Sequence, residues 1–167
     1  MSLLSTFVTR TLQTAGPATA ATSAAVAACG AIEDGNPVAP VNAVSHIAWG
    51  DEAASHEEVS LKYTASGATL NAAAIASWAA VYEVGFGRRA RRGDVKAALV
   101  GGVATAALAY VTDYYIAPKR LTPGFEKRLS SPSMLGIYAA LAASLPIASL
   151  VMGLNSRDEE KWPRWRA

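Results

Sequence analysis

The sequence predicts an all-α integral membrane protein, a four-helix bundle with short interfacial helices in its outer loops. Hydrophobic residues make up 51% of the 167 residues, and charged residues only 17%. A typical soluble domain has about 25% charged residues. The charges are also clustered, and the stretches between the clusters are long enough to cross a bilayer. The apolar content excludes a disordered chain, and the single cysteine excludes a disulfide scaffold.

Four apolar stretches are predicted to span the membrane within one domain, 1–167. The stretches are 11–32, 64–87, 97–117 and 133–154, and each is 21 to 24 residues long. A helix of that length measures roughly 31–36 Å, enough to cross a hydrocarbon core of about 30 Å. The alternative is a soluble, alanine-rich bundle. Soluble helices need a polar face, however, and the sequence offers too little of one for the third stretch.

The basic residues predict that both termini lie in the cytoplasm. Short cytoplasmic loops retain Lys and Arg, and ten of the fifteen basic residues fall on the side of the N-terminus if all four stretches cross. The outer loop, 33–63, has six acidic residues and one lysine, whereas the basic loop at 118–132 disagrees with this orientation. A cytoplasmic tail follows at 155–167. The strongest determinants are in the turn between the second and third spans: Arg88, Arg89, Arg91 and Arg92.

The first span has a second interpretation, as a cleaved signal. The segment Val-Ala-Ala-Cys that ends at Cys29 resembles a bacterial lipoprotein cleavage box, with Cys29 as the lipidated residue. Threonines and a proline between 11 and 19 make a weak signal core, so an uncleaved membrane helix is favoured. In both interpretations, the residues from Glu33 onward lie outside.

Small residues recur every fourth position in all four spans. Residues four apart share a helix face, and small side chains there let helix backbones approach closely. We therefore expect a tight bundle with little room for a wide pore, and kinks at Pro17 and Pro146. The rows are Gly16, Ala20, Ala24 and Ala28; Ala68, Ala72, Ala76 and Ala80; Gly101, Thr105 and Ala109; and Gly136, Ala140, Ser144 and Ala148.

The first outer loop is predicted to contain a short amphipathic helix that begins at Pro40 and ends at Gly50. This helix would lie on the outer surface or fold back against the bundle. The loop also offers metal-ligand residue types on one side of the membrane. A solvated acidic loop is the favoured interpretation, because the spacing matches no known metal motif. The candidate ligands are His46, Asp51, His56 and Glu57.

Three polar residues within the spans are candidate functional groups, because a polar group in lipid is costly unless it has a partner. Asn71 is expected to hydrogen-bond to another span. Glu83 lies near the inner surface, close to the arginine turn, and Asp113 lies near the outer surface, before Lys119 and Arg120. Local ion pairing is the favoured role of the two carboxylates. A proton or ion relay from Asp113 to Glu83 is the alternative.

The second outer loop has an amphipathic pattern. Leu121, Phe125 and Leu129 recur at a spacing of four, and Thr122 followed by Pro123 predicts that a helix begins there. Its basic residues suit phosphate headgroups or a partner protein. The candidate contact residues, with the tryptophan of the first outer loop, are Lys119, Arg120, Lys127, Arg128 and Trp49.

Two segments carry a resemblance to a known group of proteins. The segments 42–52 (NAVSHIAWGDE) and 113–126 (DYYIAPKRLTPGFE) resemble those of small bacterial inner-membrane proteins of unknown function. The resemblance covers the first outer loop and the second and third spans. It implies a location in the inner membrane and a four-span plan, but no activity and no binding residues.

The sequence gives no positive sign of catalysis. No nucleophile is flanked by a base, and no phosphate-binding loop or cofactor motif occurs, so we expect no cofactor and no enzymatic activity. The favoured function is an accessory, assembly or structural subunit that contacts membrane lipids, a second copy or a membrane-complex partner, and not nucleic acid. The first alternative is a small solute or ion translocator that uses Asn71, Glu83 and Asp113. The second is metal binding on the outer face by His46 and His56.

Overall fold

The computed structural model describes residues 2–153, and this part of the chain is helical, without strands. The predicted all-α class is therefore confirmed. The predicted tail, 155–167, lies outside the described residues. The elements are α1 (Leu3–Glu33), α2 (Ala39–Val44), α3 (His46–Trp49), η1 (Asp51–Ser55), η2 (Leu61–Ala65), α4 (Ser66–Tyr82), η3 (Glu83–Gly87), α5 (Arg88–Ala90), α6 (Val95–Val111), η4 (Thr112–Ile116), η5 (Lys119–Leu121), η6 (Phe125–Lys127) and α7 (Ser131–Ser144). Of these, η1, η5 and η6 are 3-10 helices, and η2, η3 and η4 are π-helical turns.

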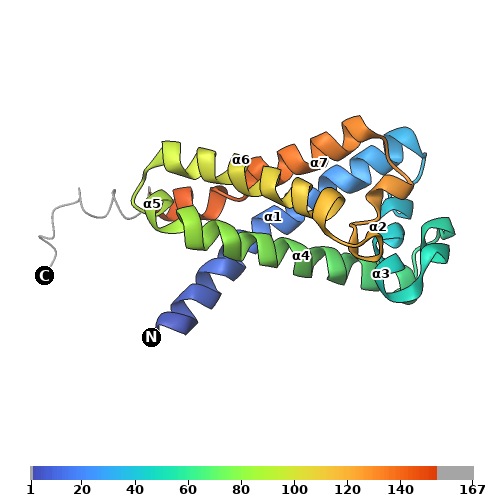
Figure 1. The fold of residues 1–167 in the computed structure, drawn as a ribbon, viewed down its shortest axis with the longest axis horizontal. Helices are drawn as coiled ribbons and strands as arrows, with labels where there is room; N and C mark the ends of the chain where they lie inside the picture. Colours follow the sequence, from blue (N-terminus) through green and yellow to red (C-terminus); the bar gives the residue numbers. More distant parts are fainter. Residues whose placement is uncertain (1, 154–167) are drawn as a thin grey trace, which may run out of the picture.

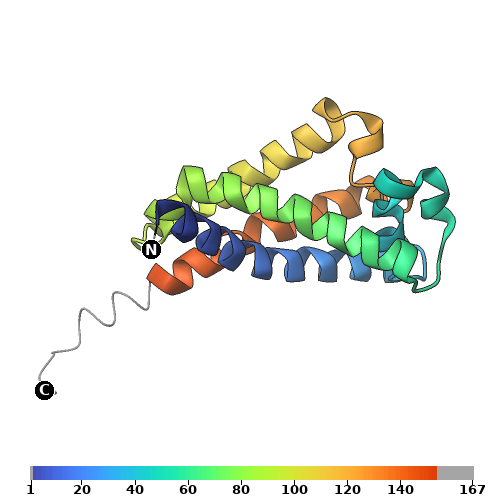
Figure 2. The ribbon, with the colours of Figure 1, turned by 90° about the horizontal axis from the view of Figure 1, so that it is seen from below.

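Four long helices lie side by side (Figures 1 and 2). Helix α1 packs against α4 and α7, and α6 packs against α7 and α4. The beginning of α1, the short α5 and the last described residues lie at one end of the molecule. Helices α2 and α3 and the segment between α6 and α7 lie at the other end. The chain therefore returns to the end where it began after each pair of long helices.

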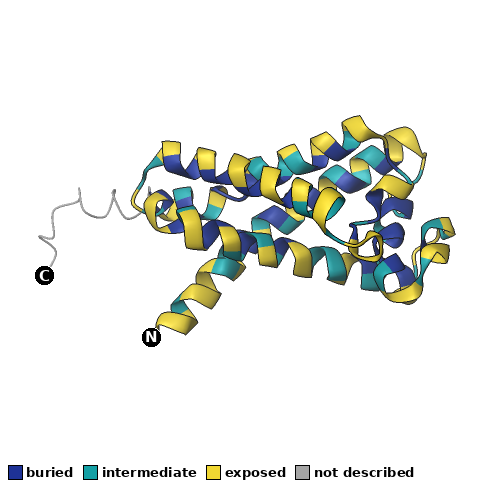
Figure 3. Cartoon of the chain, viewed as in Figure 1, coloured by how far each residue is buried: buried dark blue, intermediate teal, exposed yellow. Residues whose placement is uncertain are grey.

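Three helical segments are long and apolar enough to cross a membrane: Leu3–Glu33, Val95–Ile116 and Ser131–Gly153. Figure 3 shows that the outward faces of the long helices are exposed, and these faces carry large apolar side chains such as Leu99, Val103 and Leu135. Such a surface suits lipid better than water, which indicates a membrane protein. The predicted span 64–87 is helical but is not among the three, because Asn71, Glu83 and the serines lower its hydropathy.

The helices pack around a core of small and aromatic residues. The larger cluster lies between the four long helices and includes Ala18, Ala79, Tyr82 and Leu145. A second cluster, built around Val26, Val44, Phe125, Met134 and Ile137, joins α1 and α7 to the connecting segments. The connecting segments are thus part of the packed fold and do not merely link the helices.

The row of small residues predicted for the first span is on the wrong face of α1. Gly16, Ala20, Ala24 and Ala28 are exposed. The packed row lies two residues earlier in register and contains two threonines, which a rule based on small side chains alone does not select. Their hydroxyls find acceptors inside the protein, so they can be buried. The buried row is Thr14, Ala18, Thr22, Val26 and Gly30.

In the third span, the predicted row Gly101, Thr105 and Ala109 is buried. Next to it, Gly102 marks a close approach of α6 to α7: a β-carbon at this position would overlap the carbonyl oxygen of Ala142. Because lipid gives helices little hydrophobic reason to associate, close backbone contact of this kind supplies much of the attraction between them.

Turn residues explain two of the connections. Pro40 lies in the first turn of α2, and Gly50, with φ of 86°, follows the end of α3, but the single helix predicted between them is divided at Ser45 into α2 and α3. Pro146 interrupts the last helix, which resumes over 147–153. The helix predicted from Pro123 is wrong. Gly124 instead adopts a left-handed conformation with φ of 88°, which leaves only the short η6.

Substitution of Gly102 tests the close packing of α6 on α7. We expect Gly102→Ala to lower the free energy of unfolding by about 1–3 kcal/mol, because the new methyl group has no room against the α7 backbone. Gly136→Ala is the matched control, since nothing lies within 4 Å of the added carbon. It should leave stability unchanged or raise it by about 0.5–1 kcal/mol. Unfolding in detergent measures both, and equal effects would contradict the packing.

Candidate functional site

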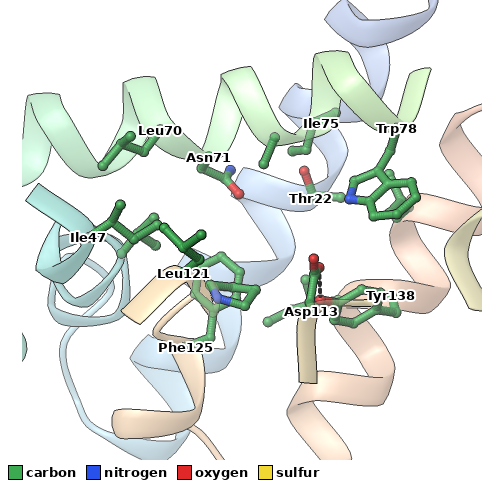
Figure 4. Close-up of a pocket in the computed structure, with 15 residues that line it drawn as sticks. Thr22, Ile47, Leu70, Asn71, Ile75, Trp78, Asp113, Leu121, Phe125 and Tyr138 are labelled. Atoms are coloured by element: carbon green, nitrogen blue, oxygen red, sulfur yellow. Dashed lines mark hydrogen bonds between the residues drawn. The ribbon is translucent and has the colours of Figure 1, made fainter. Parts of the chain in front are cut away.

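Asn71 and Asp113 face the same cavity, which has a volume of about 80 Å³ (Figure 4). Asn71 comes from α4 and Asp113 from η4, and the two side chains point toward the cavity from opposite sides. The remaining wall is mostly apolar and includes Trp78 and Phe125. Such a cavity suits a small, mainly apolar molecule with one or two hydrogen-bonding groups.

The carboxylate of Asp113 is held by an aromatic group. The hydroxyl of Tyr138 donates a hydrogen bond to its Oδ2 at 2.6 Å. The ring of Tyr138 lies 5.2 Å from that of Tyr110 and 6.1 Å from that of Tyr114. Asp113 makes no ion pair within residues 2–153, so the expected local pairing is not formed. After Pro118, Lys119 and Arg120 instead line a separate pocket.

The side-chain amide of Asn71 has no hydrogen-bond partner in the described part of the chain, although the sequence predicted one from another span. It faces the cavity instead. A donor and an acceptor of the protein are thus available to a molecule that enters there. Two cavity residues were not singled out from the sequence: Thr22, which lies on the packed row of α1, and Trp78.

Glu83 lies in a different environment, near the opposite end of the molecule. Its side chain is only 2% exposed and pairs with Arg91, whose Nη2 lies 2.9 Å from its Oε1. The hydroxyl of Thr14 donates to the same oxygen at 2.6 Å. Gly87 stands against the carboxylate, which leaves no room for a β-carbon there. This buried group joins α1, η3 and the turn after α5.

The two carboxylates are not connected by the geometry that a relay would need. Glu83 does not line the cavity that contains Asp113. Its oxygens are engaged by Thr14 and Arg91, and Arg91 also reaches the backbone carbonyl of Arg10. Glu83 therefore acts as part of a structural lock between helices, and the relay interpretation has no support from these contacts.

The two connecting regions at the other end are fastened to each other by ion pairs. We call residues 33–63 and 117–130 the loop cap. Lys127 Nζ lies 2.6 Å from Asp51 Oδ1, and Arg128 Nη2 lies 2.6 Å from Asp34 Oδ2 and 2.7 Å from Glu57 Oε1. The hydrogen bond from Lys127 lowers the pKa of the Asp51 carboxyl. These contacts join segments that are far apart in the sequence into one layer.

Asn42 anchors the inside of the loop cap, although the sequence did not single it out as a site residue. Its amide donates to the backbone carbonyls of His56 and Glu58 at 2.9 and 3.1 Å, and its Oδ1 accepts from the hydroxyl of Thr64 at 2.6 Å. An amide at the centre of a short apolar helix needs such partners to be buried. The position of Asn42 in a short apolar helix could therefore have identified it, from the sequence, as a residue that needs hydrogen-bond partners.

Of the four candidate metal ligands, only His46 and Asp51 line the same pocket. Asp51 and Glu57 are engaged by Lys127 and Arg128, and His56 stacks on Tyr63 with ring centroids 3.8 Å apart. Residues 2–153 contain no group of three His, Cys, Asp or Glu side chains that could hold a metal ion. The metal interpretation of His46, His56, Asp51 and Glu57 is therefore not supported by the geometry.

The candidate contact residues lie in different environments and have different roles. Lys119, Arg120 and Lys127 line an open pocket, whereas Arg128 is mostly buried in its two ion pairs and is structural. Trp49 is exposed, and its indole N–H donates to the hydroxyl of Ser66 at 3.0 Å. Of the arginine turn, Arg91 points inward to Glu83, while the others are exposed: Arg88, Arg89 and Arg92.

Removal of Arg91 tests the buried lock. We expect Arg91→Ala to lower the free energy of unfolding by about 3–5 kcal/mol, because it leaves Glu83 charged, buried and unpaired. Arg89→Ala is the matched control: its ion pair with Asp94 is largely exposed and should be worth about 0–1 kcal/mol. Denaturant titration in detergent measures both variants.

A second substitution separates charge from packing. Glu83→Gln removes the buried charge but keeps an acceptor for Thr14, so the double variant with Arg91→Ala should recover part of the lost stability. No recovery, or equal losses from Arg91→Ala and Arg89→Ala, would show that Glu83 is not held as the contacts indicate.

Two separate sites result: a cavity with Asn71 and Asp113, and a buried lock around Glu83. Tyr138 and Thr14, the partners of the two carboxylates, were not identified from the sequence, because each lies on another helix far away in the chain. A buried acceptor in a span nonetheless signals that a donor must be nearby.

The chain matches no family model, no curated protein and no solved structure.

Proposed function

We propose that the protein is a multi-pass bacterial inner-membrane protein with four spans, 11–32, 64–87, 97–117 and 133–154, and with both termini in the cytoplasm. Three apolar helices support the membrane location. The fourth long helix, α4, runs beside them although it is less apolar (Figure 1). The N-terminal end of α1 lies at the same end as the arginine turn, as a cytoplasmic N-terminus requires.

Within that membrane, the protein acts as a non-enzymatic accessory, assembly or structural subunit through protein or lipid contacts. The observation that carries this proposal is the loop cap, a preorganised polar surface at the end of the molecule opposite the arginine turn. Its ion pairs fix the two connecting regions before any partner arrives, which lowers the entropic cost of binding. Trp49 is exposed on this surface, and tryptophan is a frequent anchor in interfaces.

A second candidate function is the translocation of a small solute or ion. The cavity with Asn71 and Asp113 favours it, because both polar side chains face an interior space. The closed environment of Glu83 disfavours it, since no polar path joins the two ends through that residue. The two functions differ in one measurable respect: translocation requires a flux in reconstituted vesicles that Asp113→Asn abolishes.

Cysteine labelling tests the topology. In a Cys29→Ala background, we expect Ser55→Cys to react with a membrane-impermeant maleimide in cells with a permeabilised outer membrane. Val95→Cys, at the start of α6, should react only after the inner membrane is lysed. Both side chains are exposed and neither substitution removes a charge. Labelling of Val95→Cys from outside would reverse the proposed orientation, and labelling of both in a membrane-free fraction would refute a membrane location.

Purification in mild detergent tests the contact function. We expect the protein to retain a stoichiometric partner or a second copy, and Arg128→Ala to reduce its recovery several-fold by releasing Asp34 and Glu57 from the loop cap. Lys96→Ala, which removes an exposed charge outside the loop cap, is the control. A strictly monomeric protein without a partner, or equal losses from both variants, would contradict a function that depends on the loop cap.

A further inference from the structure

A second hollow lies in the loop cap, with a volume of about 300 Å³ and open to solvent. Its wall brings together the first residue of α3, the glycine that follows α3, the start of η1 and both short helices of the second connecting region. Three of its side chains are cationic and one is anionic, so the hollow has an excess of positive charge. The lining residues are His46, Gly50, Asp51, Lys119, Arg120 and Lys127.

His46 is the unusual member of this group. Its side chain is buried, with 2% exposed, and its Nδ1 lies 2.9 Å from the carbonyl oxygen of Ala43. A carbonyl only accepts, so Nδ1 donates this bond. The other ring nitrogen, Nε2, is buried and has no partner within residues 2–153. Buried polar atoms in native proteins nearly always have a partner, so an unpaired one beside a pocket is available to a bound water or to an external ligand.

The ring of His46 cannot easily turn away from this position. Gly124 packs against it so closely that a β-carbon there would overlap Nδ1 and the carbonyl of Ala43, and Gly124 also needs its left-handed conformation. The second connecting region thus holds the imidazole in place. The imidazole that lines the hollow is therefore held in a fixed position, as a binding group should be.

The charges of the hollow are only partly balanced. Lys127 Nζ pairs with Asp51 Oδ1 at 2.6 Å, and its hydrogen bond and charge lower the pKa of the Asp51 carboxyl. Lys119 and Arg120 are exposed and form no ion pair in the part of the chain that the structure describes. The hollow therefore has enough volume and enough unbalanced positive charge to accept one further anion.

We propose that this hollow is a phosphate-group binding site formed by His46, Lys119, Arg120 and Lys127. Arginine and lysine bind phosphate oxygens through charge-assisted hydrogen bonds. Nε2 completes the set: it donates to a phosphate oxygen as imidazolium, or accepts from a P–OH group when neutral. Asp51 serves as the internal counterion of Lys127 and limits the affinity.

The phosphate group has two sources, a lipid headgroup and free phosphate, and the fold favours the lipid. The neighbours of the pocket residues line the apolar cavity: Ile47 follows His46, Leu121 follows Arg120, and Phe125 precedes Lys127 by two residues. Figure 4 shows Ile47, Leu121 and Phe125 at that cavity. The same two segments thus border one site for an anion and one for an apolar group. The proposal rests on, and makes specific, the lipid contacts of the proposed function.

Binding to purified, detergent-solubilised protein tests the site with three probes. These are inorganic phosphate, a short-chain phosphatidylglycerol and the diacylglycerol with the same acyl chains. We expect saturable calorimetric binding of phosphatidylglycerol, and a shift of the Nε2 resonance of ¹⁵N-labelled His46. Arg120→Ala should weaken binding about tenfold, as expected when one charge-assisted hydrogen bond is lost. Asp51→Asn should strengthen binding, because it removes the only carboxylate that lines the hollow.

Lys62→Ala is the matched control, since Lys62 belongs to the loop cap but does not line the hollow. Binding of both inorganic phosphate and phosphatidylglycerol supports the site with either source, and binding of phosphatidylglycerol alone supports the lipid. Equal binding of diacylglycerol, no binding of any probe, or equal effects of Lys62→Ala and Arg120→Ala would overturn the proposal. Membrane insertion and partner recovery are measured in separate experiments. A failure of phosphate binding would therefore overturn this site without overturning the proposed function.

Discussion

The long helices carry apolar side chains on their outward faces, so their polar groups must find partners inside the protein. This constraint arranges much of the interior. The buried Thr22 and Ser144, like the exposed Thr69 and Ser77, donate their hydroxyls to backbone carbonyls four residues earlier in the chain. The stronger groups need partners from other helices: Glu83 takes Arg91 and Thr14, and Asp113 takes Tyr138. Asn71 makes no such bond and faces a cavity, and the buried hydroxyls of Thr11 and Thr105 also have no partner within residues 2–153.

Close packing and the loop cap complete the fold in complementary ways. Along the helices, Gly102 and the buried alanines let backbones approach, which favours van der Waals attraction where the hydrophobic effect is weak. At the loop cap, which water can reach, ion pairs join the two connecting regions. Glu33 accepts from both the backbone N–H and the hydroxyl of Ser130, next to the ion pairs of Arg128. The end of α1 is thereby fixed to the start of α7.

Local chemistry made part of this arrangement predictable from the sequence. Helix content followed from long uncharged stretches, and the pairing of Glu83 with the arginine turn followed from a separation of only eight residues. The features that sequence reasoning missed depend on how each helix is rotated about its axis and on contacts between residues far apart in the chain. The packed face of α1 was misassigned, because side-chain size does not say which face of an apolar helix turns inward. The tyrosine that binds Asp113 lies 25 residues away, and the conformation of Gly124 depends on tertiary contact with His46.

The segment that contains η5 and η6 has two opposite tasks in one short stretch of chain. Its apolar residues close the cavity that contains Asp113, and its basic residues close the hollow beside His46. Both sets are carried on the same few peptide units, fixed at Gly124 by packing and at Lys127 by an ion pair. A molecule that moves this segment at one site must therefore also move the wall of the other. Binding free energy at the two sites is coupled to the extent that one ligand changes the position of the shared segment.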